Sequence, residues 1–350
     1  MKTIGWLVNF GIKKVKYLKW LIPFIWWWRQ VAINMHFIAP TGNFSQNRKE
    51  VIKALVFFIP STILGGLTLL LPNIGKRVNK KDQKRSFKYE VTIVVIVKNE
   101  TPYIDEWIAY HHLIGVDRFV IYDNDSDDNL LCSLKKYMDM GLVEYVHFSG
   151  LHQQVPAYSD ALVKYREKTR YLGYLDIDEF IVIHNDINLK DLLFNHFEKY
   201  PCAGGLAIQW YMYGSSGHKA KPDGLVMKNY LHRAPVEFNP AVKTIGNPRL
   251  MKCIVNAHNP IYKINVYSLN EVGEKVFGMS LLDISPHNIH INHYFTKSEE
   301  ECRAKFERGQ VALVPKYKWD AFTRMDRNDV YDDTLLNYVP KVERYINLLK

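Results

Sequence analysis

Two aspartates separated by one apolar residue form the part of this sequence best suited to chemistry. Asp176 and Asp178 flank Ile177 and directly follow an apolar run, Tyr171–Leu175, that we expect to end a buried strand. Carboxylate oxygens are preferred ligands of Mg²⁺ and Mn²⁺, and these ions commonly bridge carboxylates to phosphate groups. A metal ion held here would neutralise charge on a departing diphosphate. A solvated acidic turn is the alternative, but the position at a buried strand end favours the ligand site.

Polar residues also follow two other apolar runs of the chain. Tyr89–Val97 and Arg118–Tyr122 are rich in the β-branched and aromatic residues typical of buried strands. Ligands of open α/β sheets bind at the carboxyl ends of the strands, so we expect the polar residues at these ends to face one site. They are Lys98, Asn99 and Glu100 after the first run, and Asp123, Asn124 and Asp125 after the second.

Asp123 and Asp125 have the chemistry for nucleotide recognition. Carboxylates at strand ends accept hydrogen bonds from ribose hydroxyls, and the edge of a uracil ring is a second possible partner. The same residues are also good formers of turns, and the two roles are compatible. Lys98 is equally well explained as a solvated loop cation.

The elements that must position these side chains alternate between strands and helices. This order predicts an α/β fold, with a mostly parallel, twisted sheet and helices on both faces. The sequence has no G-x-G-x-x-G turn and no G-x-x-x-x-G-K-[ST] loop, so phosphates would have to be held another way, such as by a divalent ion on carboxylates. We expect strands over 89–97, 118–122 and 142–148 and a strand end at 173–175, and helices over 103–113, 130–140, 158–170, 303–309 and 341–349.

The positive charge of the chain is concentrated in its first quarter. The formal net charge of the 350 residues is +10, but residues 1–90 hold 16 Lys and Arg against three acidic residues, so the remainder is slightly acidic. A nucleic-acid-binding protein would be expected to carry its basic stripe on the folded domain. A basic segment interleaved with Trp and Leu instead predicts contact with an anionic membrane surface.

Residues 1–88 are predicted to associate with a membrane. Trp20–Trp28 is short and rich in tryptophan, which suits the headgroup boundary, whereas Ala54–Leu71 is an uncharged run that just reaches spanning length. Basic residues precede and follow these stretches, which places both flanks and the following domain on the cytoplasmic side. A re-entrant hairpin or two interfacial helices would satisfy this arrangement. The alternative is that 54–71 is a buried helix of a soluble protein.

The cysteine and sequon patterns bear on the compartment. The four cysteines contain no C-x-x-C pair, so they predict neither a zinc site nor a disulfide framework and are compatible with a reducing compartment. Two N-glycosylation sequons, beginning at Asn99 and Asn124, fall inside the predicted site, where glycans would block it. Both observations agree with a catalytic domain on the cytoplasmic side.

Several motifs in order resemble glycosyltransferase family 92 and its relatives in the GT-A superfamily. The resemblance covers about residues 89–310, and a series of motifs is far more specific than any one of them. The motifs are VKNE at 97–100, Glu106-Trp107 with Tyr110-His111, GVDRFVIYDNDSDD at 115–128, YLDIDEF at 174–180, WYMYGSSGH at 210–218 and INHYFTKSEEE at 291–301, followed by Lys305, Arg308 and Gly309.

The resemblance implies a GT-A fold, a nucleotide-sugar donor that we expect to be a UDP-sugar, and an inverting reaction. It implies Mn²⁺ or Mg²⁺ on Asp176 and Asp178, with His293 completing the metal site; His287 and His290 are competing candidates. It also places Lys297, Lys305 and Arg308 toward the diphosphate, although a solvated helix face explains them as well. Inversion requires a general base, for which His218 and Asp223 are the candidates. An acidic residue is expected in the strand after their loop, but the sequence there is Val226–Asn229.

These observations predict a membrane-associated glycosyltransferase that acts on a glycan or lipid-linked acceptor and binds no nucleic acid. A sugar nucleotidyltransferase of related fold is one alternative, although it would be expected to carry a glycine-rich basic loop after the first strand. A non-catalytic nucleotide-sugar-binding membrane protein is another. The predicted domains are the membrane-associated segment 1–88, the GT-A domain 89–310 and a helical extension 311–350.

Overall fold

The strand β1 (Tyr89–Val97) lies in the middle of the parallel part of the sheet. Seven of its nine residues are buried, as expected for a strand covered on both faces. In the computed structural model β1 pairs in parallel with β2 (Arg118–Asp123) on one side and with β4 (Thr169–Tyr174) on the other, and β2 pairs in parallel with β3 (Val143–His147). These four strands therefore point their carboxyl ends toward one edge.

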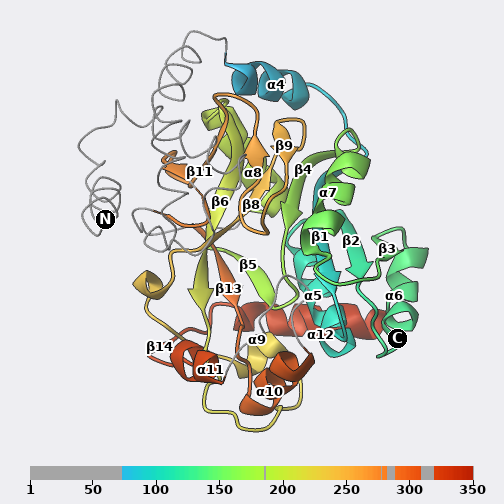
Figure 1. Ribbon diagram of the computed structural model, residues 1–350, viewed down its shortest axis with the longest axis vertical. Coiled ribbons are helices and arrows are strands. Elements are labelled where there is room, and N and C mark those ends of the chain that lie inside the picture. The colour runs from blue at the N-terminus through green and yellow to red at the C-terminus, as the bar shows by residue number, and fades with distance from the viewer. Residues whose placement is uncertain (1–72, 185–186, 277, 282–287, 309–318, 350) are drawn as a thin grey trace, which may run out of the picture. The chain divides into compact units, whose positions relative to one another are not determined.

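Six further strands extend the sheet beyond β4 (Figure 1). β8 runs antiparallel to both β4 and β6, while β11 and β13 pair in parallel with β6. β5 and β12 are antiparallel to β13 and β11. The predicted α/β class with a mostly parallel sheet is thus confirmed. The bounds are β5 (Glu179–Ile183), β6 (Ala203–Met212), β8 (Val242–Gly246), β11 (Tyr267–Leu269), β12 (Lys275–Val276) and β13 (Ile289–His293).

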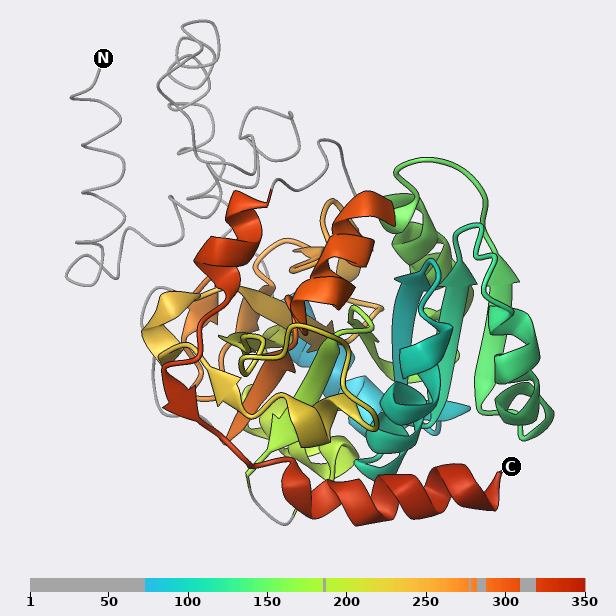
Figure 2. The ribbon, with the colours of Figure 1, turned by 90° about the horizontal axis from the view of Figure 1, so that it is seen from below.

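Helices cover both faces of the sheet (Figure 2). α7 (Gln154–Tyr165) packs its apolar residues against the face that includes Val94 and Val120. On the opposite face, Trp107 of α5 (Thr101–Leu113) packs against Phe119 with ring centroids 5.4 Å apart. The other helices of four or more residues in the described part of the chain are α4 (Ile74–Gln83), α6 (Leu130–Asp139), α8 (Leu189–Lys199), α9 (Val226–Asn229), α10 (Glu299–Arg308), α11 (Asp320–Met325) and α12 (Val339–Leu348).

Three predicted elements differ from the structure. The helix expected over 158–170 ends at Tyr165, because Thr169–Tyr174 pairs with the central strand as β4. Val226–Asn229, expected in a strand, forms the short helix α9, whose first N–H groups bind the distant carboxylate of Glu106. The helix expected from 303 begins at Glu299, because Ser298 and Glu301 exchange hydrogen bonds as a capping box.

The structure describes residues 73–184, 187–276, 278–281, 288–308 and 319–349. The chain divides into two compact units, 1–74 and 75–350, and the second is called the larger unit below. The predicted membrane stretches 20–28 and 54–71 lie outside the described residues. Within the described ranges, no helix combines the length and the apolar composition needed to cross a bilayer. The short elements β7 (His232–Arg233), η3 (Val236–Phe238), β9 (Met251–Cys253), β10 (Ile261–Tyr262), β14 (Val330–Tyr331) and η4 (Leu336–Tyr338) complete the described part of the larger unit.

Candidate functional site

The two aspartates lie in a tight turn between β4 and β5, at the carboxyl edge of the sheet. The Asp176 N–H donates to the Glu179 carboxylate at 2.9 Å, and the Glu179 N–H donates back to the Asp176 carbonyl oxygen at 3.1 Å. This exchange fixes the backbone of the turn. β4 stays with β1, whereas β5 pairs with β13, so the turn stands where the two parts of the sheet separate.

A buried lysine from β8 holds the first aspartate. The Lys243 ammonium lies 2.8 Å from a carboxylate oxygen of Asp176 and 3.4 Å from one of Glu179, and its side chain is fully buried. Burial alone would raise the pKa of Asp176 and lower that of Lys243, but their mutual attraction reverses both shifts. Burial dominates for Glu179 and raises the pKa of its carboxyl well above the ordinary value. Asp176 and Lys243 therefore form a charged pair beside a carboxyl group that favours its proton.

The second aspartate is shared between a lysine and a histidine. Lys305 of α10 donates to one oxygen of Asp178 at 2.6 Å, and His293 Nε2 lies 3.6 Å from the other. Burial would raise the pKa of Asp178, but Lys305 and His293 hold it well below the usual range. The antiparallel pairing of β5 with β13 sets His293 opposite Glu179, which explains its position beside Asp178.

Several buried atoms of this cluster have no hydrogen-bond partner among the described residues. They include Glu179 Oε1, His293 Nδ1 and Trp210 Nε1. The indole of Trp210 packs on the His293 ring with centroids 4.3 Å apart. It also contacts the ring of His258, whose pKa burial lowers to about 4. Buried polar atoms are nearly always satisfied in folded proteins, so unpaired atoms at a sheet edge mark a place for a ligand.

Asp178 and His293 have the chemistry and spacing of a pair of metal ligands. Their 3.6 Å separation is too long for a hydrogen bond, whereas two ligands bound to one ion at about 2.1 Å each lie roughly 3–4 Å apart. The described residues contain no group of three His, Cys, Asp or Glu side chains arranged to hold a metal ion. A cation here would thus take two protein ligands and the rest from substrate phosphates and water, as Mg²⁺ often does.

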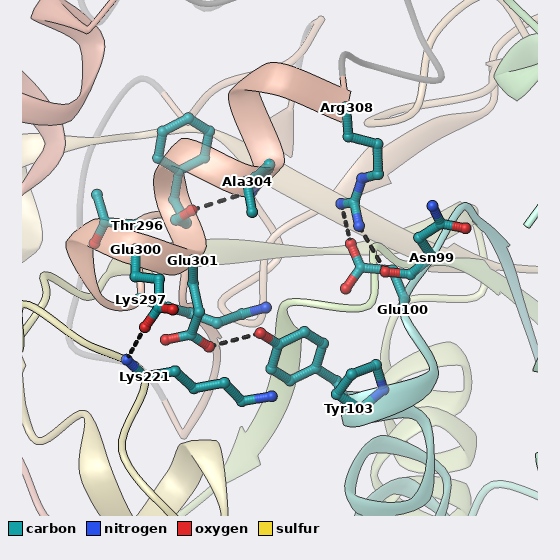
Figure 3. Close-up of a pocket in the computed structure, with 13 residues that line it drawn as sticks. Asn99, Glu100, Tyr103, Lys221, Thr296, Lys297, Glu300, Glu301, Ala304 and Arg308 are labelled. Carbon is teal, nitrogen blue, oxygen red and sulfur yellow. Dashed lines mark hydrogen bonds and ion pairs between the residues drawn. The ribbon is translucent and has the colours of Figure 1, made fainter. Parts of the chain in front are cut away.

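A cavity of about 260 Å³ opens beside Lys305 (Figure 3). Its walls come from the turn after β1, the start of α5, the loop after β6, the segment before α10 and α10 itself. Four of its side chains are cationic and three are acidic, which suits an anionic ligand with polar groups. The residues that line it are Asn99, Glu100, Pro102, Tyr103, Lys221, Phe295, Thr296, Lys297, Glu300, Glu301, Ala304, Lys305 and Arg308.

Lys297 brings a buried ammonium group to this cavity. Its backbone is left-handed, with φ of 49°, and its Nζ lies 3.3 Å from the centroid of the Tyr103 ring. Glu301 fixes that ring by accepting the Tyr103 hydroxyl at 2.6 Å. Among the described residues no carboxylate oxygen lies within 4.0 Å of Lys297 Nζ, and burial lowers the pKa of this lysine. Within the described ranges, this cation therefore has no contacting counter-ion.

Arg308 connects the end of α10 to the turn after β1. Its guanidinium donates to the Asn99 carbonyl oxygen at 2.7 Å and pairs with the Glu100 carboxylate (Figure 3). Asn99 adopts a left-handed conformation, with φ of 53°, which turns its carbonyl toward the helix. Glu100 Oε2 is buried without a partner among the described residues. Lys98 beside them is half-buried.

The Asp123–Asp125 cluster forms a self-bonded turn at the end of β2. Asp123 accepts hydrogen bonds from the Tyr145 hydroxyl at 2.7 Å and the Ser126 N–H at 2.9 Å. The Asn124 amide is buried and donates to two backbone carbonyl groups. The backbone of Asp125 is in the left-handed conformation and its side chain is partly exposed. The Asp125 carboxylate accepts the Gly150 N–H at 3.1 Å. The turn interpretation thus describes this cluster, and the exposed Asp125 remains available to a ligand.

The two candidate bases lie in the loop after β6. His218 is half-buried, and its Nε2 is 3.2 Å from the Asn229 carbonyl oxygen. Asp223 is exposed. Neither lines the cavity, although Lys221 between them does. The structure therefore sets the metal candidates Asp178 and His293 beside each other and places Lys297 and Arg308 in the adjoining cavity. Asp176 is in the same turn as Asp178, but among the described residues the three predicted ligands do not form a group that could hold a metal ion. The two candidate bases are not gathered at the cavity.

Sequence reasoning did not identify Lys243, although the signal was present. A lone lysine inside the otherwise uncharged strand Val242–Gly246 breaks the pattern of a buried strand, and buried lysines are rare unless they are paired. Glu301 was also missed as a site residue. It accepts hydrogen bonds from Tyr103, Tyr230 and Ser298, and so positions the wall that faces Lys297.

The comparison with protein families agrees with this geometry. The model of glycosyltransferase family 92 matches residues 92–342. A family 92 protein from Arabidopsis thaliana is 26% identical over 269 residues, covering 71% of this chain and 44% of the relative. One from Oryza sativa subsp. japonica is 29% identical over 252 residues, covering 69% of this chain and 40% of the relative. The chain belongs to glycosyltransferase family 92, as its motifs predicted.

The chain spans less than half the length of these curated relatives. Among solved structures, a 4-diphosphocytidyl-2C-methyl-D-erythritol synthase from Anaerococcus prevotii is similar over 56% of this chain and 92% of its own, at 10% identity and a TM-score of 0.30. A likeness of that size supports no conclusion about activity.

Proposed function

We propose that this protein transfers a sugar from a nucleotide-sugar donor, with UDP-sugars as the expected class, to a hydroxyl group of a glycan or lipid-linked acceptor, with inversion. The observation that carries this proposal is the cluster around Asp176 and Asp178, with unpaired buried atoms and an adjoining cation-lined cavity. Membership in glycosyltransferase family 92 supports the same reaction class.

The cations of the site suit a nucleoside diphosphate. Lys297 and Arg308 face the cavity, and Lys305 links it to Asp178. Preorganised cations stabilise the charge that develops on a departing diphosphate, because they are already oriented when the bond breaks. Asp123 and Asp125, at the end of the neighbouring strand, are the proposed contacts for the ribose or the base.

We further propose a divalent cation, Mn²⁺ or Mg²⁺, held by Asp178 and His293 with Asp176 nearby. When bound, the ion would act as a Lewis acid toward the leaving diphosphate. Lys243 keeps Asp176 ionised and oriented, and the Trp210 ring fixes the plane of His293. His218 and Asp223 remain the proposed candidates for the base that accepts the proton of the acceptor hydroxyl.

Membrane association of residues 1–88 and a cytoplasmic location of the catalytic domain are also proposals. The cytoplasmic location is supported by the side-chain amide of Asn124, the residue that begins a glycosylation sequon. A glycan would be attached to this nitrogen, but the nitrogen is buried and donates hydrogen bonds to the carbonyl oxygens of Phe148 and Gly150. Protease protection in membrane vesicles of known orientation would test it. Digestion of the larger unit from the luminal or external side alone would contradict the proposal.

The decisive experiment measures release of the nucleoside diphosphate. The detergent-solubilised protein would be incubated with a panel of UDP- and GDP-sugars, with Mn²⁺ or with a chelator, and with or without glycan acceptors. We expect release from one donor that depends on the metal and is lost in Asp178→Asn. Release of pyrophosphate from UTP and a sugar phosphate would instead indicate a nucleotidyltransferase. Binding of the donor that is unchanged by the chelator, without any turnover, would indicate a non-catalytic binding protein.

A further inference from the structure

The helix α4 contacts the rest of the larger unit through polar rather than apolar side chains. Gly75, Asn79 and Asp82 are its buried residues. The Asn79 amide donates to the carbonyl oxygens of Pro201 at 2.9 Å and Ala203 at 2.7 Å, and Asp82 pairs with Arg249 at 2.6 Å. These directional contacts fix the rotation of α4 about its own axis, and so determine which side chains face outward.

The outward face of α4 is cationic. Its single acidic residue, Asp82, is buried against Arg249, so the exposed side of this helix carries no carboxylate. A basic face on a short helix complements an anionic surface. The exposed cations of α4 and of the turn that follows it are Lys76, Arg77, Lys80, Lys81 and Lys84.

This cationic face and the candidate cavity lie at opposite edges of the sheet. α4 contacts Ala203, at the amino end of β6, whereas His293, at the carboxyl end of the parallel strand β13, belongs to the candidate site. A strand the length of β6, ten residues, spans roughly 30 Å. Figure 1 shows α4 above the sheet and α10 below it, and in Figure 2, seen from below, α10 stands in front of the sheet.

We propose that the exposed face of α4 binds anionic phospholipid headgroups and thereby turns the candidate cavity away from the bilayer. This inference rests on the proposed membrane association. Charge complementarity supports a lipid surface, and so does chain continuity, because the uncharged stretch Ala54–Leu71 ends just before α4 in the sequence. It follows that the acceptor hydroxyl belongs to a glycan that extends well beyond the headgroups, not to a short lipid headgroup at the surface.

Vesicle binding by the full chain tests the lipid contact. Partitioning would be measured on phosphatidylcholine vesicles and on vesicles that also contain phosphatidylglycerol. Phosphatidylglycerol should increase the vesicle affinity of the wild type. In the triple variant Lys80→Glu, Lys81→Glu, Lys84→Glu this increase should be at least about tenfold smaller. The control with the same change in charge is Lys135→Glu, Lys341→Glu, Arg344→Glu, at exposed positions of α6 and α12, and it should keep the wild-type increase.

The outcomes separate the two proposals. If the wild type binds vesicles but both triple variants behave alike, the α4 proposal is wrong while membrane association stands. If the wild type binds neither vesicle, membrane association fails, and the α4 proposal fails with it. Tighter binding to duplex DNA than to vesicles, lost in the α4 variant alone, would assign the face to nucleic acid and overturn the lipid contact.

A photo-cross-linking amino acid tests the orientation. It would replace Ser86, which is exposed in the turn after α4, or Lys219, which is exposed and whose backbone carbonyl oxygen accepts the Glu300 N–H at 3.0 Å beside the cavity. On vesicles with phosphatidylglycerol, lipid adducts are expected at position 86 and not at position 219. Adducts at 219, whether alone or to the same extent as at 86, would contradict the proposed orientation.

Discussion

Two buried clusters of charged side chains stand at opposite edges of the same sheet and differ in how fully they are satisfied. At the amino edge, Arg249 pairs with Asp82 and donates to the backbone carbonyl groups of Arg166, Thr169 and Arg170 at 2.6–2.7 Å. Each guanidinium nitrogen has a partner. This cluster ties α4 and the end of α7 to the sheet, and its central guanidinium is fully paired.

At the carboxyl edge the cluster is incomplete. Asp176 and Asp178 are paired, but Glu179 Oε1, His293 Nδ1 and Glu100 Oε2 are buried without partners among the described residues. Leaving such atoms unpaired costs free energy that folding must recover elsewhere. The comparison indicates that one cluster serves the fold and the other is reserved for a ligand. The four predictions below test this difference, from the largest expected effect to the smallest.

Arg249→Leu should lower the free energy of unfolding by about 3–5 kcal/mol, because it strands the buried Asp82 carboxylate. Urea denaturation followed by circular dichroism would measure the change. Arg327→Leu is the control, since Arg327 forms an exposed pair with Asp329 at 2.8 Å, and it should leave the midpoint unchanged. Equal effects of the two substitutions would show that the amino-edge cluster does not stabilise the fold as described.

Asp178→Asn should reduce sugar transfer about 10²–10³-fold, equivalent to about 3–4 kcal/mol of transition-state stabilisation. Its effect on the free energy of unfolding should be smaller than that of Arg249→Leu, because its partner Lys305 keeps contact with water. Initial rates of nucleoside diphosphate release at saturating donor would check the first effect. Wild-type turnover in the variant would remove Asp178 from the site.

The third prediction concerns Glu106, a buried carboxyl group that accepts backbone hydrogen bonds but contacts no cation among the described residues. It asks whether such hydrogen bonds alone keep a carboxylate ionised. Burial raises its pKa from 4.5 to about 7, although it accepts the N–H groups of Val226 and Met227 at 2.8 and 2.9 Å. The folded state therefore holds the proton more tightly than the unfolded state. Below about pH 4.5 the protonated Glu106 carboxyl contributes its full amount, about 3 kcal/mol, to the free energy of unfolding. This contribution is lost as the pH rises through 7.

The measurement compares the free energy of unfolding of the wild type and Glu106→Gln at pH 5 and pH 8. The wild type should lose about 2–3 kcal/mol more than the variant between these values. A difference between the two proteins that stays constant with pH would mean that Glu106 is ionised in the fold.

Lys297→Met should have opposite effects on binding and stability. Removing the ammonium should weaken UDP binding about tenfold, because a charge-assisted contact to phosphate is lost. The free energy of unfolding should stay the same or rise slightly, since the variant no longer buries a cation that has no contacting counter-ion among the residues the structure describes. Calorimetric titration with UDP measures the first effect and urea denaturation the second. Lys135→Met, at an exposed position of α6, is the control for loss of charge.

The parallel core of the fold was predictable because its strands are buried on both faces. Tyr89–Val97 matches β1 at both ends, and β2 extends the predicted strand by a single residue. The position of Asp176 and Asp178 at the carboxyl edge followed from the same rule. A strand that is buried on both faces can be recognised from its own residues, because few types of side chain fit such a position.

The rest depends on contacts that are distant in the sequence. Lys243 is 67 residues from Asp176, and α9 is capped by a carboxylate 120 residues earlier, so neither partner is visible locally. The segment 166–170 continues the helical spacing of α7, but pairing with β1 outweighs it from Thr169 onward. Roles for His218 and Asp223 stay predictions, because the acceptor that would define them leaves no local pattern.

The register of the antiparallel pair β5 and β13 determines which side chains face the site. Glu179 faces His293, Phe180 faces Asn292, and the pairs continue in step along both strands. Because side chains alternate between faces, a slip of one residue would turn His293 away and bring Asn292 toward Asp178. Insertions are therefore expected to be tolerated in loops outside the strands of the sheet, but not within the ladder. Length variation among homologues should obey this boundary.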